Sequence, residues 1–171
     1  MKIVLIGYMA SGKSTIGKIL AKELNLSFID LDHYISDREQ MSIPEIFTQK
    51  GEIYFRKIET KYLLEVLKKE QEFILSLGGG TPCYGNNMEI ILNSDAASVY
   101  LKASIPTITE RIRTGKRKRP LVAHLSNEEL PEFIGKHLFE RQFYYLQSNH
   151  SITVDGKQKY EIVDDLLKAL C

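Results

Sequence analysis

The sequence predicts an α/β fold with three layers, in which helices cover both faces of a parallel sheet. Short β-rich runs alternate with helical patterns along the chain, and strands that are separated by helices pair in parallel. Most strand cores are apolar without clean alternation, as expected for strands that are buried on both faces. A glycine-rich loop also joins the first strand to the first helix. For a chain of 171 residues, we expect a single domain over residues 1–171 with small insertions.

The predicted elements follow one another in a regular order. The predicted strands are Lys2–Gly7, Ser27–Asp32, Phe73–Gly78, Ser98–Ala103 and Ser151–Asp155. The predicted helices cover residues 13–25, 43–49, 52–69, 86–93, 105–114, 127–147 and 158–170. Ser42 and Glu45 have the spacing of a capping box, and Pro44 is tolerated in a first helical turn.

The composition narrows the class of protein. The chain has 23 basic and 22 acidic residues, a balance that does not favour nucleic acid or an anionic membrane as its main partner. Cys83 and Cys171 are too few and too far apart for a disulfide framework, which favours a reducing compartment. No apolar run approaches the roughly 20 residues that span a bilayer. Because a strand is predicted from residue 2, we expect no cleavable signal and a soluble, cytoplasmic protein.

The segment Gly7-Tyr8-Met9-Ala10-Ser11-Gly12-Lys13-Ser14 has the pattern of a phosphate-binding loop. Backbone N–H groups of such a loop, together with the positive end of the helix that follows, hold an oligophosphate. Lys13 would reach the outer phosphates, and the Ser14 hydroxyl would ligate Mg²⁺. The alternative is a tight glycine turn without a ligand, but the flanking strand and helix favour the phosphate site.

Two further segments follow predicted strands at the carboxyl edge of the sheet, where ligands bind in such folds. In Asp30-Leu31-Asp32, strand alternation would place both carboxylates on one face, about 6.6 Å apart along the chain. One could support the hydration shell of Mg²⁺ while the other accepts a hydrogen bond from an attacking hydroxyl; alternatively, both only cap the next turn. Gly78-Gly79-Gly80 either lets the backbone approach a hydroxylated ligand or forms a flexible turn.

Basic residues suggest where an anion could bind. Arg56 and Glu59 have helical i, i+3 spacing, so the glutamate could fix the guanidinium for bidentate carboxylate binding; an exposed ion pair is the alternative. Six basic residues between 111 and 119, closed by Pro120, predict a lid at about residues 111–125 that covers a polyanion. A solvated loop is the alternative, and missing aromatic residues disfavour nucleic acid. From its neighbours alone, Arg141 is a surface arginine over aromatic residues.

The motifs GYMASGKST, FIDLD, FRKIE, LGGGTP and KRPL, followed by Arg141-x-x-x-Tyr145, resemble the shikimate kinase family over nearly the whole chain. The resemblance implies a monomeric phosphate-loop kinase whose five-stranded parallel sheet has the order 2-3-1-4-5. It also implies a substrate-binding region at about residues 32–61. The implied reaction is Mg²⁺-dependent transfer of the ATP γ-phosphate to the 3-hydroxyl of shikimate, a step toward chorismate and the aromatic amino acids. Phe143 and the pair Asn149-His150 depart from the residues usual in the family.

By this resemblance, the catalytic residues are Lys13, Asp32 and Arg119, and the residues that support Mg²⁺ are Ser14 and Asp30. The implied ATP-binding residues are Ala10, Ser11, Gly12, Lys13, Ser14, Thr15, Arg113, Arg119 and Gln158. The implied substrate-binding residues are Asp32, Arg56, Gly79, Gly80 and Arg141, in which the arginines hold the shikimate carboxylate. Asp32 either removes a proton from the reacting hydroxyl or only orients it.

Other functions are compatible with a phosphate loop. A nucleoside monophosphate kinase would need a pocket for a base where this chain offers arginines and an aspartate. A gluconate-type kinase also phosphorylates a hydroxyl of a small carboxylate, and is the nearer alternative. A non-catalytic ATP-binding module would lack one of the catalytic positions, and none is missing here.

Overall fold

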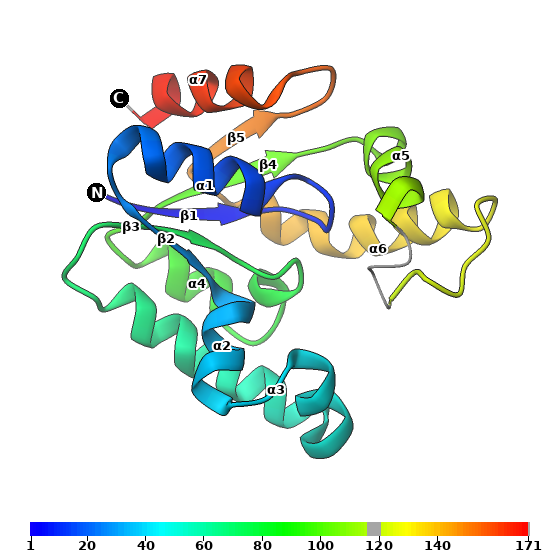
Figure 1. Cartoon of the computed structure of the whole chain (residues 1–171), viewed down its shortest axis with the longest axis horizontal. Coiled ribbons are helices and arrows are strands. Elements are labelled where there is room, and N and C mark those ends of the chain that lie inside the picture. Colours follow the sequence, from blue (N-terminus) through cyan, green and yellow to red (C-terminus); the bar gives the residue numbers. More distant parts are fainter. Residues whose placement is uncertain (116–120, 171) are drawn as a thin grey trace.

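The computed structural model describes residues 1–115 and 121–170, and it places five strands in one parallel sheet (Figure 1). The strands are β1 (Lys2–Ile6), β2 (Ser27–Asp30), β3 (Phe73–Ser76), β4 (Ala97–Lys102) and β5 (His150–Thr153). Their order is β2-β3-β1-β4-β5, which confirms the order that the family resemblance implies. All five predicted strands therefore exist, with ends that differ from the prediction by up to two residues.

The central strand shows why the strand cores lack alternation. β1 pairs with β3 through Ile3 and Ile74, and with β4 through Ile3 and Ala97. The four residues from Ile3 to Ile6 are fully buried. A strand with a strand on either side and a helix layer over each face favours apolar side chains at every position.

Helices cover both faces of this sheet, as predicted (Figure 1). They are α1 (Lys13–Leu24), α2 (Leu31–Glu39), α3 (Ile43–Leu67), the 3₁₀ turn η1 (Thr81–Cys83), α4 (Asn87–Leu92), α5 (Ile105–Gly115), α6 (Leu130–Tyr145) and α7 (Lys159–Leu170). α1 and α7 lie together on one face, whereas α4 and the end of α6 lie on the other. Because the strands are parallel, their carboxyl ends meet at one edge, from which α1, α2 and η1 depart.

The prediction of a strand over residues 27–32 is wrong at its end. β2 stops at Asp30, and Asp32 lies in the first turn of α2, a helix that the sequence analysis did not predict. The cause is local: the Asp30 carboxylate accepts hydrogen bonds from the backbone N–H groups of Asp32 at 3.1 Å and His33 at 3.3 Å. An aspartate that caps the following N–H groups starts a helix and ends the strand.

The helices predicted over 43–49 and 52–69 form one element, α3, that is interrupted at Gly51. Gly51 has φ 85° and ψ 169°, a left-handed backbone conformation that favours glycine, so the two halves meet at a kink. The capping box is confirmed: Glu45 N–H donates to Ser42 Oγ at 3.3 Å, and Ser42 N–H donates to Glu45 Oε2 at 2.7 Å.

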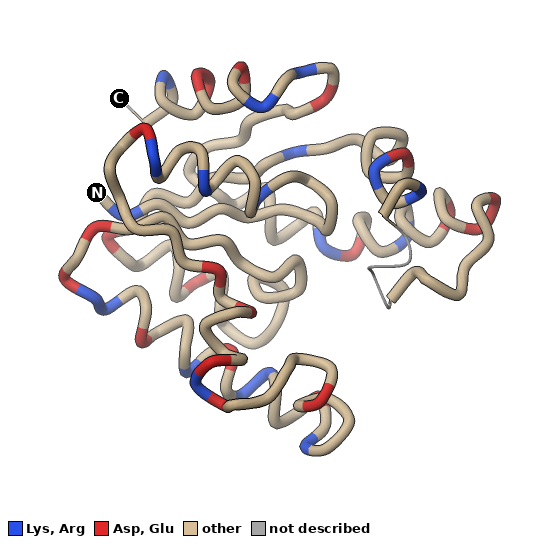
Figure 2. Tube along the Cα trace, in the orientation of Figure 1, with Lys and Arg blue, Asp and Glu red and all other residues tan. Residues whose placement is uncertain are grey.

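Charged residues are distributed as the balanced composition suggests. Figure 2 shows Lys and Arg interspersed with Asp and Glu along the described trace, on α1, α3, α6 and α7 alike. Within the described residues, no helix is long and apolar enough to cross a membrane.

We expect Gly17→Ala in α1 to lower the free energy of unfolding by about 1–3 kcal/mol, the usual cost of overpacking. A Cβ at Gly17 would lie 2.5 Å from the Phe28 ring and 3.0 Å from Leu5, where α1 crosses the sheet. Gly135→Ala in α6 is the matched control, because among the described residues its Cβ would meet only Ile105, at 3.5 Å. Urea unfolding of both variants checks this: the control should gain about 0.5–1 kcal/mol from helix propensity. Equal gains in both variants would contradict the close packing of α1.

Candidate active site

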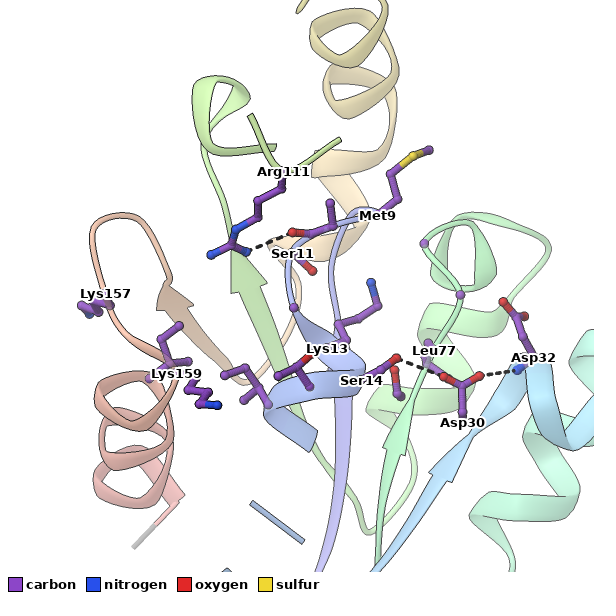
Figure 3. A pocket seen from close by; sticks show the side chains of 18 residues that line it. Met9, Ser11, Lys13, Ser14, Asp30, Asp32, Leu77, Arg111, Lys157 and Lys159 are labelled. Atoms are coloured by element: carbon purple, nitrogen blue, oxygen red, sulfur yellow. Dashed lines mark hydrogen bonds between the residues drawn. The ribbon is translucent and has the colours of Figure 1, made fainter. Parts of the chain in front are cut away.

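A cavity of about 510 Å³ lies at the carboxyl edge of the sheet (Figure 3). Its walls come from the phosphate-binding loop, the ends of β2 and β3, Arg111 of α5 and the start of α7. Ligands of open α/β sheets bind at this edge, where loops from several strands converge. The prediction that the glycine loop, the acidic pair and the triple glycine lie together is therefore correct.

The phosphate-binding loop, residues 7–14, is a compact turn before α1. Gly12 has φ 99°, which favours glycine, and α1 begins at the next residue. At Gly7 the requirement is space, because a Cβ there would lie 2.7 Å from Ser11 Oγ and 2.9 Å from the Leu101 carbonyl oxygen. The first N–H groups of α1 have no acceptor within the helix and lie at the cavity. This end of the helix can therefore bind an anion.

Lys13 has its ammonium group inside the loop. Its Nζ donates to the carbonyl oxygens of Gly7 at 2.7 Å and Tyr8 at 3.0 Å. The side chain lines the cavity and is 9 % exposed. A buried cation beside the first turn of α1 adds positive charge where an oligophosphate would lie.

Asp30 connects the loop to the acidic segment. Its Oδ2 accepts a hydrogen bond from Ser14 Oγ at 3.1 Å, while its Oδ1 caps α2 (Figure 3). Both functions considered for this residue, capping and support of a cation beside Ser14, are thus compatible. A hydroxyl and a carboxylate suit Mg²⁺, which binds oxygen and keeps few protein ligands. Among the described residues no larger group of metal-binding side chains converges, so water and phosphate would complete the coordination.

Asp32 is half-buried at the cavity, and among the described residues nothing donates a hydrogen bond to its carboxylate. Burial raises the pKa of Asp32 to about 6, and the nearby charges of Asp30 and Glu59 act in the same direction. Lys13 and Arg56 oppose this pKa shift. A carboxylate with a pKa near neutrality and no bound donor is suited to accept a proton.

Arg56 and Arg141 converge on the triple glycine. A Cβ at Gly80 would lie 3.1 Å from both terminal nitrogens of Arg56 and 3.3 Å from Arg141 Nη2. A Cβ at Gly79 would lie 3.0 Å from Arg141 Nη1. Close approach is therefore the reason for these glycines, since none of Gly78, Gly79 and Gly80 has a positive φ.

Glu59 holds Arg56 from behind, and a buried tyrosine fixes the glycine backbone beside Arg141. Glu59, which is 1 % exposed, accepts from Arg56 Nη1 at 2.8 Å and from Thr81 Oγ1 at 2.8 Å. The alternative of an exposed ion pair is thereby excluded. Tyr145, one turn after Arg141, is fully buried and donates its hydroxyl to the Gly79 carbonyl oxygen at 2.6 Å. Two guanidinium groups that meet over a glycine strip, one of them paired with a buried glutamate, form a site for a carboxylate.

The described part of the basic segment reaches the cavity through Arg111. Arg111 lines the cavity and donates to the Ala10 carbonyl oxygen at 3.0 Å, a contact visible in Figure 3. Arg113 donates to the Asn127 carbonyl oxygen at 3.3 Å and does not line the cavity. Residues 116–120, which include Arg119, lie outside the described residues. Helical phase could have indicated Arg111, because it lies one turn after the buried Ile108.

The far end of the cavity is formed by α7 and the loop before it. Lys157, Lys159 and Ile162 line it, although the sequence analysis singled out none of them. The predicted residue Gln158 lies between the two lysines, and its backbone N–H donates to Glu161 Oε2 at 2.6 Å. Sequence reasoning found the segment but not the lining residues, because the start of α7 has no motif of its own.

Comparison with known proteins agrees with this site. Residues 9–171 match the family model described as shikimate kinase. Shikimate kinase from Flavobacterium johnsoniae is 51% identical over 169 residues, which cover 99% of this chain and 98% of the relative. Shikimate kinase from Flavobacterium psychrophilum is 47% identical over 169 residues, with the same coverage.

Solved structures give the same result. Shikimate kinase from Bacteroides thetaiotaomicron has a TM-score of 0.90 at 35% identity and covers 99% of this chain and 98% of its own. Shikimate kinase from Acinetobacter baumannii in complex with shikimate has a TM-score of 0.86 at 29% identity, and the match covers 99% and 92%. A gluconokinase from Sinorhizobium meliloti, with a TM-score of 0.64 at 20% identity, shares the fold alone.

The family model and the full-length relatives decide between the candidate classes: the chain belongs to the shikimate kinase family, and it is an ATP-dependent kinase that acts on a hydroxyl group.

Proposed function

We propose that this site transfers the γ-phosphate of ATP to the 3-hydroxyl of shikimate, which gives shikimate 3-phosphate and ADP. One observation carries the proposal: the guanidinium groups of Arg56 and Arg141 meet over Gly80, beside the Asp32 carboxylate and the phosphate-binding loop. A small acid that bears a hydroxyl needs such an arrangement. The cationic pair would bind its carboxylate, and the aspartate would face its hydroxyl.

In the transfer step, the acceptor oxygen forms a bond to the γ-phosphorus as the bond to the β,γ-bridging oxygen breaks. The bridging oxygen leaves with ADP, and the acceptor hydroxyl gives its proton to Asp32. Arg56 and Arg141 orient the acceptor, while Gly79 and Gly80 let the backbone approach it. Since such transition states have little covalent contact with the protein, positioning and charge supply most of the catalysis.

On the nucleotide side, the loop residues Ala10 to Thr15 would bind the phosphates, with the ammonium of Lys13 on the γ-phosphate. Ser14 and Asp30 would hold Mg²⁺, which neutralises phosphate charge when bound. We propose that Arg119 is the lid arginine that contacts the phosphates, and that Arg113 and Gln158 lie beside the adenine. The 3.0 Å contact between Arg111 and Ala10 supports Arg111 as a further residue over the loop.

We also propose that the enzyme works as a monomer in the cytoplasm, without nucleic-acid or membrane partners. The near-even charge and the two separated cysteines support this assignment.

A coupled assay of ADP release tests the function. The purified chain with ATP and Mg²⁺ should release ADP with shikimate and not with gluconate. ADP release with gluconate alone would support the gluconate-type alternative, and no release with either acid would support a non-catalytic module.

We expect Asp32→Asn to lower kcat by about 10²- to 10⁴-fold, the usual contribution of a positioned general base. The affinity for ATP should change little, because the loop and Lys13 are intact. Steady-state kinetics and ATP titration measure both effects. Normal turnover would remove Asp32 from the reaction.

The Asp32→Asn variant should also unfold at a higher temperature than the wild type at pH 8, since the raised pKa of Asp32 makes its ionised form unfavourable in the folded state.

The pH dependence of kcat/KM should follow the ionisation of Asp32. With the pKa of Asp32 at about 6, the carboxylate is protonated below that pH and cannot accept a proton. We expect kcat/KM to be level from about pH 7 to 8 and to fall about tenfold per pH unit well below 6. The residual rate of Asp32→Asn should lack this acid limb, and a limb that persists would belong to another group.

Arg56→Lys should raise the KM for shikimate about 10- to 100-fold, with a small effect on kcat, because an ammonium cannot replace a bidentate guanidinium. KM measured at saturating ATP checks this. Lys136→Arg, on an exposed part of α6, is a charge-matched control that should leave KM unchanged. An unchanged KM in Arg56→Lys would place the acceptor carboxylate elsewhere.

A further inference from the structure

We propose that Tyr84 is a positioning residue for the acceptor carboxylate, because its ring holds the Arg56 guanidinium in the plane that bidentate binding requires. The inference rests on the proposed function, since it takes Arg56 as a ligand of that carboxylate. The sequence analysis did not single out Tyr84, which lies 28 residues from Arg56 in the chain.

The contact itself is a stacked pair. The Arg56 guanidinium carbon, Cζ, lies 3.6 Å from the centroid of the Tyr84 ring. This is the shortest cation–ring distance in the described part of the chain, where the next is 4.6 Å, between Lys50 and Tyr54. At 3.6 Å a planar guanidinium lies flat on the ring at van der Waals distance. The Tyr84 ring therefore covers one face of the group that would bind the acceptor.

Tyr84 is held in this place from both sides. It directly follows η1, whose Cys83 N–H donates to the Gly80 carbonyl oxygen at 2.9 Å. Its own carbonyl oxygen accepts from Asn87 N–H at 3.2 Å. Its hydroxyl donates to Glu52 Oε1 at 3.3 Å, one helical turn before Arg56 on α3. The ring thus extends from Glu52 to Arg56 along α3, and its backbone is fixed to the triple glycine.

Arg56 needs such a restraint. Glu59 binds one edge of the guanidinium, at Nη1. On the other edge, Arg56 Nε forms only a long ion pair with Glu52 Oε1, at 3.9 Å, and is buried with no hydrogen-bond partner among the described residues. One bond at an edge leaves rotation of the guanidinium plane open, whereas a ring stacked on its face restricts that rotation. A carboxylate that binds two N–H groups at once requires them to be coplanar with it. Restricting the guanidinium plane before binding lowers the conformational entropy that is lost on binding. We therefore expect Tyr84 to affect KM and affinity more than kcat.

Two substitutions at Tyr84 separate the effect of the ring from that of its hydroxyl. Tyr84→Phe keeps the stacked ring and removes only the bond to Glu52, so the KM for shikimate should stay within about twofold of the wild type. Tyr84→Leu keeps apolar cover but has no π face, and it should raise KM about two- to thirtyfold, the range of cation–π contacts. Tyr160→Leu is the matched control: this tyrosine is 60% exposed beside Lys159 and makes no contact with Arg56, so KM for shikimate should not change.

A double-mutant cycle identifies the partner. When Tyr84→Leu is added to Arg56→Lys, which has no planar group to restrain, it should raise KM less than twofold further. Calorimetric titration with shikimate should give the same ratios in Kd, and the melting temperatures of all variants show that they are folded. A merely structural role for Tyr84 would lower the melting temperature and raise KM equally in both backgrounds.

Three results would overturn the inference: an unchanged KM in Tyr84→Leu, an equal loss in Tyr84→Phe, or an equal factor in the Arg56→Lys background. Failure of the proposed function is distinguishable, because the wild type would then release no ADP with shikimate. If the wild type is active and Tyr84→Leu is kinetically normal, only the role of Tyr84 is wrong.

Discussion

The active site depends on one carboxylate, that of Asp30, which makes two contacts in opposite directions. One oxygen accepts from Ser14 at the start of α1, and the other caps α2. The first contact joins β2 to the phosphate-binding loop. The second turns the chain out of the sheet, so that Asp32 lies in a helix turn at the cavity. Without the cap, a continuing strand would carry Asp32 past the loop. The geometry of the nucleotide site and that of the acceptor site therefore have a common origin in the last residue of β2.

The acceptor side is built at a cost to stability. Because burial raises the pKa of Asp32 to about 6, ionising it is harder in the folded protein than in the unfolded chain. By linkage, this cost is absent below the unfolded pKa, near 4, and grows as the pH rises toward 6. Above that pH, Asp32 is ionised in the folded protein although burial keeps water from solvating its charge. The proposed proton transfer to Asp32 would use this form, since a well-solvated aspartate with an ordinary pKa would be a weaker base. The positive charges of Lys13 and Arg56 oppose the rise in the pKa of Asp32 and so limit this cost to stability.

The fold was largely predictable, because strands that are buried on both faces have apolar sequences and the loop motif identifies the first strand–helix unit. Failures occurred where one side chain outweighed a pattern. In Phe28-Ile29-Asp30-Leu31-Asp32, alternation predicts a strand, but two capping hydrogen bonds to Asp30 start a helix instead. The family resemblance implies Arg113 on the nucleotide side, and the orientation of α5 adds Arg111, which contacts the loop. The stack of Tyr84 on Arg56 joins η1 to α3, and no local pattern encodes a contact between two elements that meet only in the folded chain.

Rigid support explains how side chains of separate helices can recognise one small acid. Glu39, at the end of α2, accepts from the hydroxyls of Tyr54 and Tyr62 on α3, each at 2.7 Å. These bonds lower the pKa of Glu39, so the carboxylate stays ionised and keeps both donors. They also fix the helix that carries Asp32 to the helix that carries Arg56, since Tyr54 is two residues from that arginine. A phosphate bound by backbone N–H groups tolerates motion of side chains, but a carboxylate bound by guanidinium planes does not. In the proposed site, selectivity for the acceptor would therefore depend on how firmly α2 and α3 are joined, more than on the number of groups that touch the acceptor.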